Sequence, residues 1–143
     1  MLTKRQLTQA AMLLTITPIL GGVMLFAPTS SRAEAEVLPP LPHTIEGRSG
    51  GNSYTNDCGY VGDTANYTFR LSQATNNLSA SVTSNAIGAD LTLTIKGPDG
   101  RTCLDDTNAS LMPSYDGPWP AGEYQVWVGD WGDSQPFSLT FSN

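Results

Sequence analysis

Hydrophobic residues recur at every second position in five stretches between residues 67 and 141. These stretches are 67–71, 78–82, 91–95, 124–128 and 137–141. A period of two is typical of a half-buried antiparallel strand, because successive side chains of a strand point to opposite faces of the sheet. Trp127 is out of phase with the other hydrophobic residues of its stretch, so we expect it on the opposite face.

Turn-forming residues separate these stretches. Gly, Pro, Asn and Asp gather at 96–101, 119–122 and 129–133, where Pro fixes φ and Gly supplies the positive φ of a tight turn. Three weaker strands are expected, at 44–47, 102–104 and 110–112. The alternation of strand and turn predicts an all-β protein, an antiparallel jelly-roll-type β-sandwich of about seven to eight strands.

The first 35 residues have the pattern of a secretory signal peptide. Lys4 and Arg5 precede an uncharged, mainly apolar stretch over 6–31, and small residues follow it. Cleavage is expected after Ala33 or Ala35. The alternative is an N-terminal membrane anchor, but Pro and Gly interrupt the apolar stretch, which is near the lower length limit for a span.

The export signal divides the chain into three expected segments. Residues 1–35 are the signal peptide, 36–43 a Pro-rich linker and 44–143 the folded domain. Residues 3–8 resemble a twin-arginine motif with Lys4 in place of the first Arg, and the general secretory route is the one we favour. We expect a periplasmic or extracellular protein with no membrane attachment after cleavage.

Charge and motif content exclude several functions. Residues 36–143 carry four basic and twelve acidic side chains, a formal net charge of −8, which argues against a nucleic-acid partner. The single histidine, His43, argues against a His-based catalytic triad, and H-E-x-x-H and P-loop motifs are absent from the sequence. We expect a protein that is not an enzyme; a small hydrolase or a protease-associated inhibitor is the alternative.

Both cysteines, Cys58 and Cys103, follow the expected signal peptide. An exported chain meets an oxidising compartment, and two cysteines allow one intrachain pairing. We therefore predict a Cys58–Cys103 disulfide that closes a loop of 45 residues. Two free thiols or a redox pair are the alternatives, and the absence of C-x-x-C spacing counts against the redox pair.

Asp99, Asp105 and Asp106 lie near the turn after 91–95 and are a candidate calcium site. Calcium prefers several oxygen ligands that converge from loops, whereas the alternative is that these side chains only cap backbone amides of the turn. A second candidate set is formed by Asp130 and Asp133 in the last loop, and Asp90 could join either set. Calcium is therefore the only cofactor that the sequence suggests.

Trp119, Trp131 and Tyr115 are candidate ligand-binding residues. Exposed rings beside Asp could stack on sugars or contact a protein, so the expected partner is an unknown protein or polysaccharide. The alternative, which we favour, is that these rings cap the open ends of the sandwich.

A family resemblance rests on the order of several short motifs. They are the strand 91–95, the Gly-Pro-Asp-Gly turn 97–100, the pair Asp105-Asp106, the Pro-Ala-Gly-Glu-Tyr strand entry 120–124 and the closing strand 137–140. Over residues 44–143 this layout resembles the bacterial pre-peptidase C-terminal domain and related collagen-binding-like β-sandwiches. The segments 58–59 and 100–103 resemble small exported cyanobacterial proteins of unassigned function. The resemblance implies a non-catalytic module. Together with the export signal, it leads us to expect a monomeric binding or structural module of the cell envelope or exterior.

Overall fold

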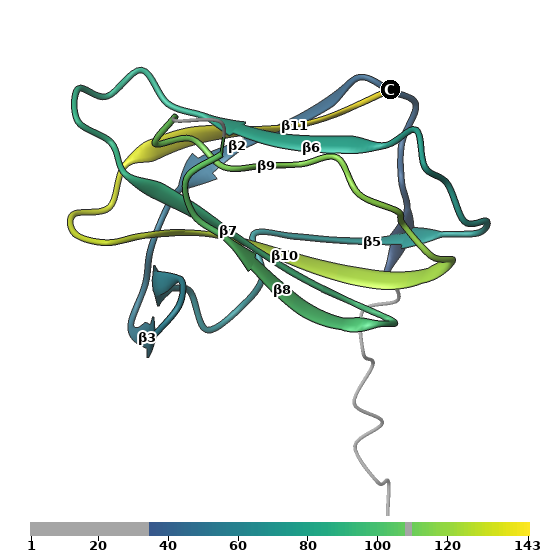
Figure 1. Ribbon diagram of the computed structural model, residues 1–143, viewed down its shortest axis with the longest axis horizontal. Coiled ribbons are helices and arrows are strands. Elements are labelled where there is room, and N and C mark those ends of the chain that lie inside the picture. Colours follow the sequence, from purple (N-terminus) through teal and green to yellow (C-terminus); the bar gives the residue numbers. More distant parts are fainter. Residues whose placement is uncertain (1–34, 108–109) are drawn as a thin grey trace, which may run out of the picture. The chain divides into compact units, whose positions relative to one another are not determined.

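The computed structural model of this protein describes residues 35–107 and 110–143. The predicted signal peptide, its alternative as an anchor and the export motif therefore lie outside the described residues, apart from Ala35. Among the described residues, no helix is long and apolar enough to cross a membrane. The residues that are described form two β-sheets that lie in two layers (Figure 1).

The larger sheet is organised around one long strand, β10. Its strands are β1 (Glu36–Val37), β3 (Ser53–Thr55), β4 (Gly59–Val61), β5 (Tyr67–Leu71), β7 (Leu91–Gly97), β8 (Gly100–Leu104) and β10 (Gly122–Asp130). β5 and β4 pair with one edge of β10, and β7 pairs with the other edge. β8 continues the sheet beyond β7, β3 pairs with β4, and β1 pairs in parallel with β5.

The smaller sheet covers the inner face of the larger one. Its strands are β2 (His43–Arg48), β6 (Ser79–Thr83), β9 (Ser114–Tyr115) and β11 (Pro136–Ser142). They lie in the order β2-β11-β6-β9, and every pair is antiparallel. The chain passes between the two sheets repeatedly, for the last time in the loop between β10 and β11.

The core consists mainly of hydrophobic side chains that alternate along the long strands and face the opposite sheet, and Leu78, Ala89 and Trp119 join it from outside the strands. Its buried members are Phe69, Leu78, Ala80, Val82, Ala89, Leu91, Leu93, Ile95, Trp119, Tyr124, Val126, Val128, Phe137, Leu139 and Phe141. Trp127 is only half buried, between two fully buried valines. The predicted alternation and the opposite orientation of Trp127 are therefore confirmed.

The predicted β-sandwich is confirmed, and its five long strands lie where the period of two placed them. The weaker strands expected at 44–47 and 102–104 are β2 and β8. The strand expected at 110–112 is wrong: Ser110 makes only an isolated bridge with Thr107, and the nearby strand is β9. The packing of this short segment depends on β6, which local sequence does not reveal.

The segment expected to be a linker is held against the domain. Glu36 and Val37 pair with β5, and the Leu38 amide donates to the Arg70 carbonyl at 3.2 Å. Leu38 and Leu41 pack against the core. Burial of these two side chains gives the segment a reason to stay on the sheet, although its prolines prevent a long strand.

Candidate functional site

Three carboxylates converge at one end of the larger sheet. Asp90 immediately precedes β7, and Asp105 and Asp106 immediately follow β8. Because β7 and β8 are antiparallel, with Leu93 opposite Leu104, the start of β7 and the end of β8 meet at the same place. One carboxylate oxygen of each residue lies within 4.8 Å of one oxygen of the others. We call these three residues the acidic cluster.

Asp99 does not belong to this cluster, although the sequence placed it there. It occupies the tight turn that joins β7 to β8, where Gly97 pairs with Gly100. A hairpin has its turn at one end and its open ends at the other, and Asp105 lies six residues further along an extended strand of about 3.4 Å per residue. The set predicted from the sequence is therefore corrected: Asp90 takes the place of Asp99.

The acidic cluster disfavours three simultaneous negative charges. The pKa of Asp90 is raised above its usual value, first by desolvation and then by the negative charges of Asp105 and Asp106. Calcium lies about 2.4 Å from each oxygen ligand, so ligands on opposite sides of the ion are about 4.8 Å apart. The three oxygens are therefore close enough together to contact one cation of this size, which would also relieve the repulsion.

Trp131 lies beside the acidic cluster and is fixed there by a hydrogen bond. It directly follows β10, whose last residue, Asp130, pairs with Leu91 at the start of β7. Its indole Nε1 donates to the carboxylate of Asp105, 3.1 Å from both oxygens. The side chain remains 36% exposed. The ring passes over Gly59, where a Cβ would lie 3.2 Å from Cδ2 of the indole, so a side chain at this position would crowd the ring.

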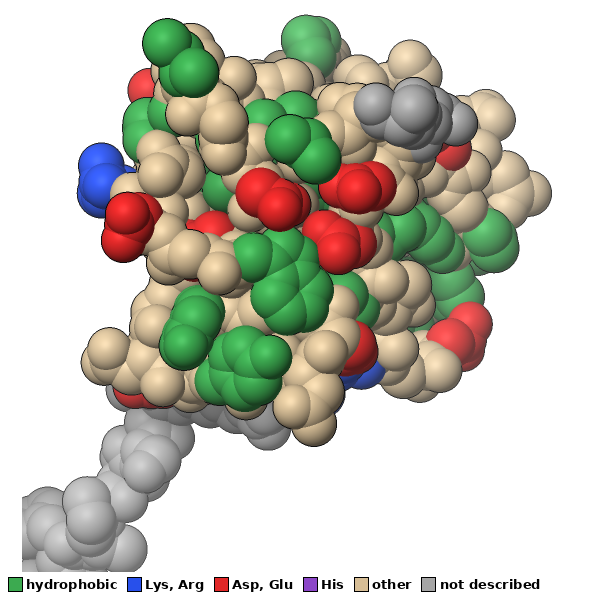
Figure 2. All heavy atoms as spheres, turned by 60° about the vertical axis from the view of Figure 1, so that its left-hand side comes forward, with side chains coloured by type: hydrophobic (Ala, Val, Ile, Leu, Met, Phe, Trp, Pro, Cys, Tyr) green, Lys and Arg blue, Asp and Glu red, His purple; other side chains and the backbone are tan. Residues whose placement is uncertain are grey.

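Two tyrosines extend the exposed aromatic surface. Tyr54 and Tyr60 face each other across the β3–β4 pair, with ring centroids 5.1 Å apart, and are 57% and 42% exposed. Tyr60 is in register with Asp130, the residue before Trp131. Figure 2 shows carboxylates and hydrophobic side chains gathered side by side on this face of the molecule. We call the acidic cluster together with Tyr54, Tyr60 and Trp131 the aromatic–acidic face.

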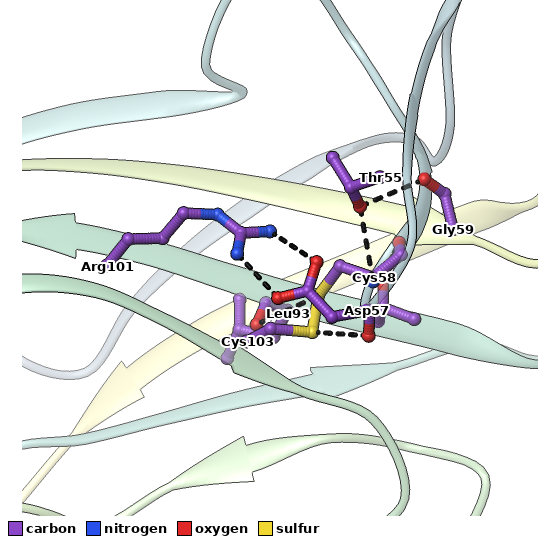
Figure 3. A network of polar contacts seen from close by, with 8 residues as sticks. Thr55, Asp57, Cys58, Gly59, Leu93, Arg101 and Cys103 are labelled. Carbon is purple, nitrogen blue, oxygen red and sulfur yellow. Dashed lines mark hydrogen bonds and ion pairs between the residues drawn. A yellow bond between two sulfur atoms is a disulfide. The ribbon is translucent and has the colours of Figure 1, made fainter.

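A disulfide holds the aromatic part of this face against the sheet. Cys58, in the turn between β3 and β4, is bonded to Cys103 of β8 with Cα atoms 5.9 Å apart, as predicted (Figure 3). The Thr92 hydroxyl of β7 donates to the Cys58 carbonyl at 2.8 Å. This bond satisfies the hydroxyl of Thr92, which is fully buried on the outer face of its strand. The β3–β4 pair is therefore fixed covalently to the strands that carry the carboxylates.

An ion pair reinforces the same junction. Arg101 donates to both carboxylate oxygens of Asp57, at 2.6 and 3.1 Å (Figure 3). Hydrogen bonding to Arg101 is the main reason that the pKa of Asp57 is lowered. Both side chains are substantially exposed, so water and salt screen the pair and its contribution to stability is small.

The other two predicted ligand-binding aromatics are not on this face. Trp119 is 1% exposed, and its Nε1 donates to the Leu78 carbonyl at 2.8 Å. Tyr115 packs edge-on against Trp119, and its hydroxyl donates to the Pro118 carbonyl. These rings pack between the sheets, so burial removes Trp119 from the surface. The aromatics that do join Trp131 are two tyrosines on either side of the Asn-Asp-Cys-Gly turn, which is the sequence signal for a short hairpin.

Asp130 and Asp133, the second candidate set, are separated by burial. Asp130 is 2% exposed, and its Oδ2 accepts a hydrogen bond from the Ser49 hydroxyl at 2.6 Å. Its Oδ1 has no hydrogen-bond partner among the residues that are described. Asp133 is exposed in the loop that follows. Asp130 therefore belongs to the interior of the sandwich.

Comparison with known proteins gives two findings. The chain is 36% identical over 103 residues to an uncharacterized protein of Synechococcus elongatus, and the match covers 68% of this chain and 73% of that protein. The structure is similar to the pre-peptidase C-terminal domain of a collagenase from Bacillus anthracis, with a TM-score of 0.51 and 20% identity over 76% of this chain and 95% of that domain. No model of a known protein family matches the chain. The second finding confirms the predicted fold.

Proposed function

Because the chain belongs to the same family as the uncharacterized Synechococcus elongatus protein and has the fold of a pre-peptidase C-terminal domain, we propose that it is an exported, non-catalytic binding module of the cell envelope or exterior. The observation that carries the proposal is the aromatic–acidic face. Three exposed rings next to three carboxylates are more than a soluble domain needs for its own folding.

The face is suited to binding because its groups are fixed in advance. The hydrogen bond to Asp105 holds the Trp131 ring, and the disulfide holds the strands that carry Tyr54 and Tyr60. A ligand therefore meets side chains that have already lost most of their conformational freedom, which lowers the entropy cost of binding. Aromatic rings provide a large contact area with few rotatable bonds.

Two features support export. The Cys58–Cys103 disulfide is chemistry of oxidising compartments. The charge and hydrophobicity pattern of residues 1–35 is that of a signal peptide. Together they favour a site of action outside the cytoplasm.

Trp131→Ala tests the proposal. The purified domain is assayed against peptidoglycan, a glycan array and a peptide array, with Val37→Ala as the matched control, because Val37 is an exposed apolar residue on β1, far from the face. We expect Trp131→Ala to lose the binding shown by the wild type while it stays folded, and Val37→Ala to keep both the binding and the fold. Equal binding by Trp131→Ala and wild type would contradict the proposal.

A calcium-stabilised module is a second candidate, favoured by the convergence of Asp90, Asp105 and Asp106. Thermal melting with calcium and with chelator tests it. Binding to the folded state alone raises the free energy of unfolding by about 2.7 kcal/mol at a calcium concentration of 100 times Kd. The rise should disappear in Asp106→Asn. An unchanged melting temperature at millimolar calcium would remove this candidate.

A further inference from the structure

We propose that the partner of the aromatic–acidic face is a basic segment of another protein, with a Lys or Arg side chain that lies on Trp131 and reaches the carboxylates of the acidic cluster. This inference rests on the proposed binding function and specifies the chemistry of the partner. It follows from the charge of the acidic cluster, from the position of the Trp131 ring, and from the other classes of partner that these two features disfavour.

The charge of the acidic cluster favours a cationic partner. Among residues 35–107 and 110–143, the single ion pair joins Arg101 to Asp57, so the acidic cluster has no cationic partner within the described chain. Its three carboxylates lie within 4.8 Å of one another on a domain with a net charge of −8. The surface is therefore complementary to a group that brings positive charge.

The ring of Trp131 also favours a cation. Tryptophan has the strongest attraction for cations among the aromatic side chains. The ring edge is occupied, because Nε1 donates to Asp105, while the side chain remains partly exposed. A guanidinium or ammonium group on this ring would lie beside the Asp105 carboxylate, so cation–π attraction and ion pairing act on the same group.

Other classes of partner are less complementary to this face. A second copy of this chain, an anionic polysaccharide and an anionic membrane all bring more negative charge to a negative surface. A neutral sugar could stack on the rings, but it would leave the repulsion among the three carboxylates uncompensated. A basic peptide can pair with the carboxylates of the acidic cluster and also lie on the Trp131 ring.

Fluorescence anisotropy with labelled octa-arginine, measured on the domain of residues 36–143, tests the inference. A neutral Gly-Ser octapeptide is the control ligand. Asp106→Asn removes an exposed carboxylate of the cluster, and Asp99→Asn removes the same charge at the far end of the β7–β8 hairpin. Trp131→Ala removes the ring, and Trp131→Phe keeps an aromatic face.

We expect octa-arginine to bind the wild type more tightly than the Gly-Ser peptide, and the affinity to fall with salt. Asp106→Asn and Trp131→Ala should each weaken binding by about two- to fivefold, the range of one exposed ion pair or cation–π contact. Asp99→Asn should stay close to wild type, and Trp131→Phe should recover part of the loss. Millimolar calcium should compete with the peptide.

Equal losses in Asp106→Asn and Asp99→Asn would overturn the inference, because they would reduce the binding to general charge attraction. Binding of a neutral glycan that is lost in Trp131→Ala, with no binding of octa-arginine, would also overturn it but would leave the proposed binding function standing. If neither peptides, glycans nor peptidoglycan bind, both proposals fail.

Discussion

The surroundings of Asp90 change the pKa of its side chain. It lies at the start of β7, where desolvation and two neighbouring carboxylates raise its pKa. The folded protein therefore binds more protons than the unfolded chain between the usual pKa of 3.8 and the raised value. Stability falls as pH rises through this window.

We predict that Asp90→Asn is more stable than the wild type at pH 7 in the presence of chelator. The gain should be a few tenths of a kcal/mol, because the cluster is only partly buried and solvent screens it. Urea melts at pH 7 and pH 3 measure it, and the difference should shrink at pH 3, where the aspartate is largely protonated in both states. A less stable Asp90→Asn at pH 7 would show that the charge is stabilising.

The two tryptophans of the predicted ligand set should respond differently to truncation. Trp119→Ala removes a buried ring and leaves the Leu78 carbonyl unpaired, so we predict a loss of about 3–5 kcal/mol in the free energy of unfolding. Trp131→Ala removes a partly exposed ring, and we predict a loss of about 1 kcal/mol or less. Chemical denaturation of both variants provides the comparison. Similar losses would contradict the assigned positions.

The sequence treats these two tryptophans as equivalent, because both lie in turn segments and neither belongs to an alternating stretch. What separates them is long-range packing. Trp119 contacts Phe69, Tyr115, Tyr124 and Phe141, which come from both sheets. Such contacts depend on the finished fold, so single-residue burial in loops was the least predictable part of the site.

At the scale of elements, strand length decides what the sequence reveals. The long strands contain several repeats of the two-residue pattern, and they were predicted for that reason. β1, β3 and β4 have two or three residues each, too few to show a period, and β1 and β4 also pair with strands that are distant in sequence. The acidic cluster was predictable in part: the sequence placed Asp105 and Asp106 together and named Asp90 as a possible member, but the antiparallel pairing of β7 with β8 is what joins Asp90 to them and separates Asp99.

The disulfide is the element-scale feature whose removal should have the largest effect. It closes a loop of 45 residues, for which the chain-entropy relation gives about 4 kcal/mol. We predict that Cys58→Ser/Cys103→Ser loses much of this amount and that amides of 53–61 exchange faster with solvent. Denaturant unfolding and hydrogen exchange measure the two effects.

Arg101→Ala is the matched control for the disulfide variant, because it removes the exposed ion pair to Asp57 and keeps the covalent bond. It should cost only about 0.2–1 kcal/mol. A double serine variant as stable as the wild type under oxidising conditions would show that the other contacts of the β3–β4 turn suffice to hold it.

At the scale of the whole molecule, a buried polar link joins the two sheets beside the aromatic–acidic face. Ser49 follows β2 of the smaller sheet, and its hydroxyl donates to Asp130 at the end of β10 in the larger sheet. The same hydroxyl accepts from the Gln135 amide at 2.8 Å, in the loop that leads to β11. The residue before Trp131 is thereby fixed to both layers.

We predict that Asp130→Ala and Ser49→Ala each destabilise the fold by about 1–3 kcal/mol, because each leaves a buried polar partner without its hydrogen bond. The double variant should lose less than the sum of the two, since the partner left unpaired by one change is removed by the other. Denaturant unfolding of the four proteins of this cycle measures the coupling. Ser134→Ala, which removes a separate bond to the Ser49 carbonyl, is the control. Strictly additive losses for Asp130 and Ser49 would mean that the sheets are held together here by packing alone.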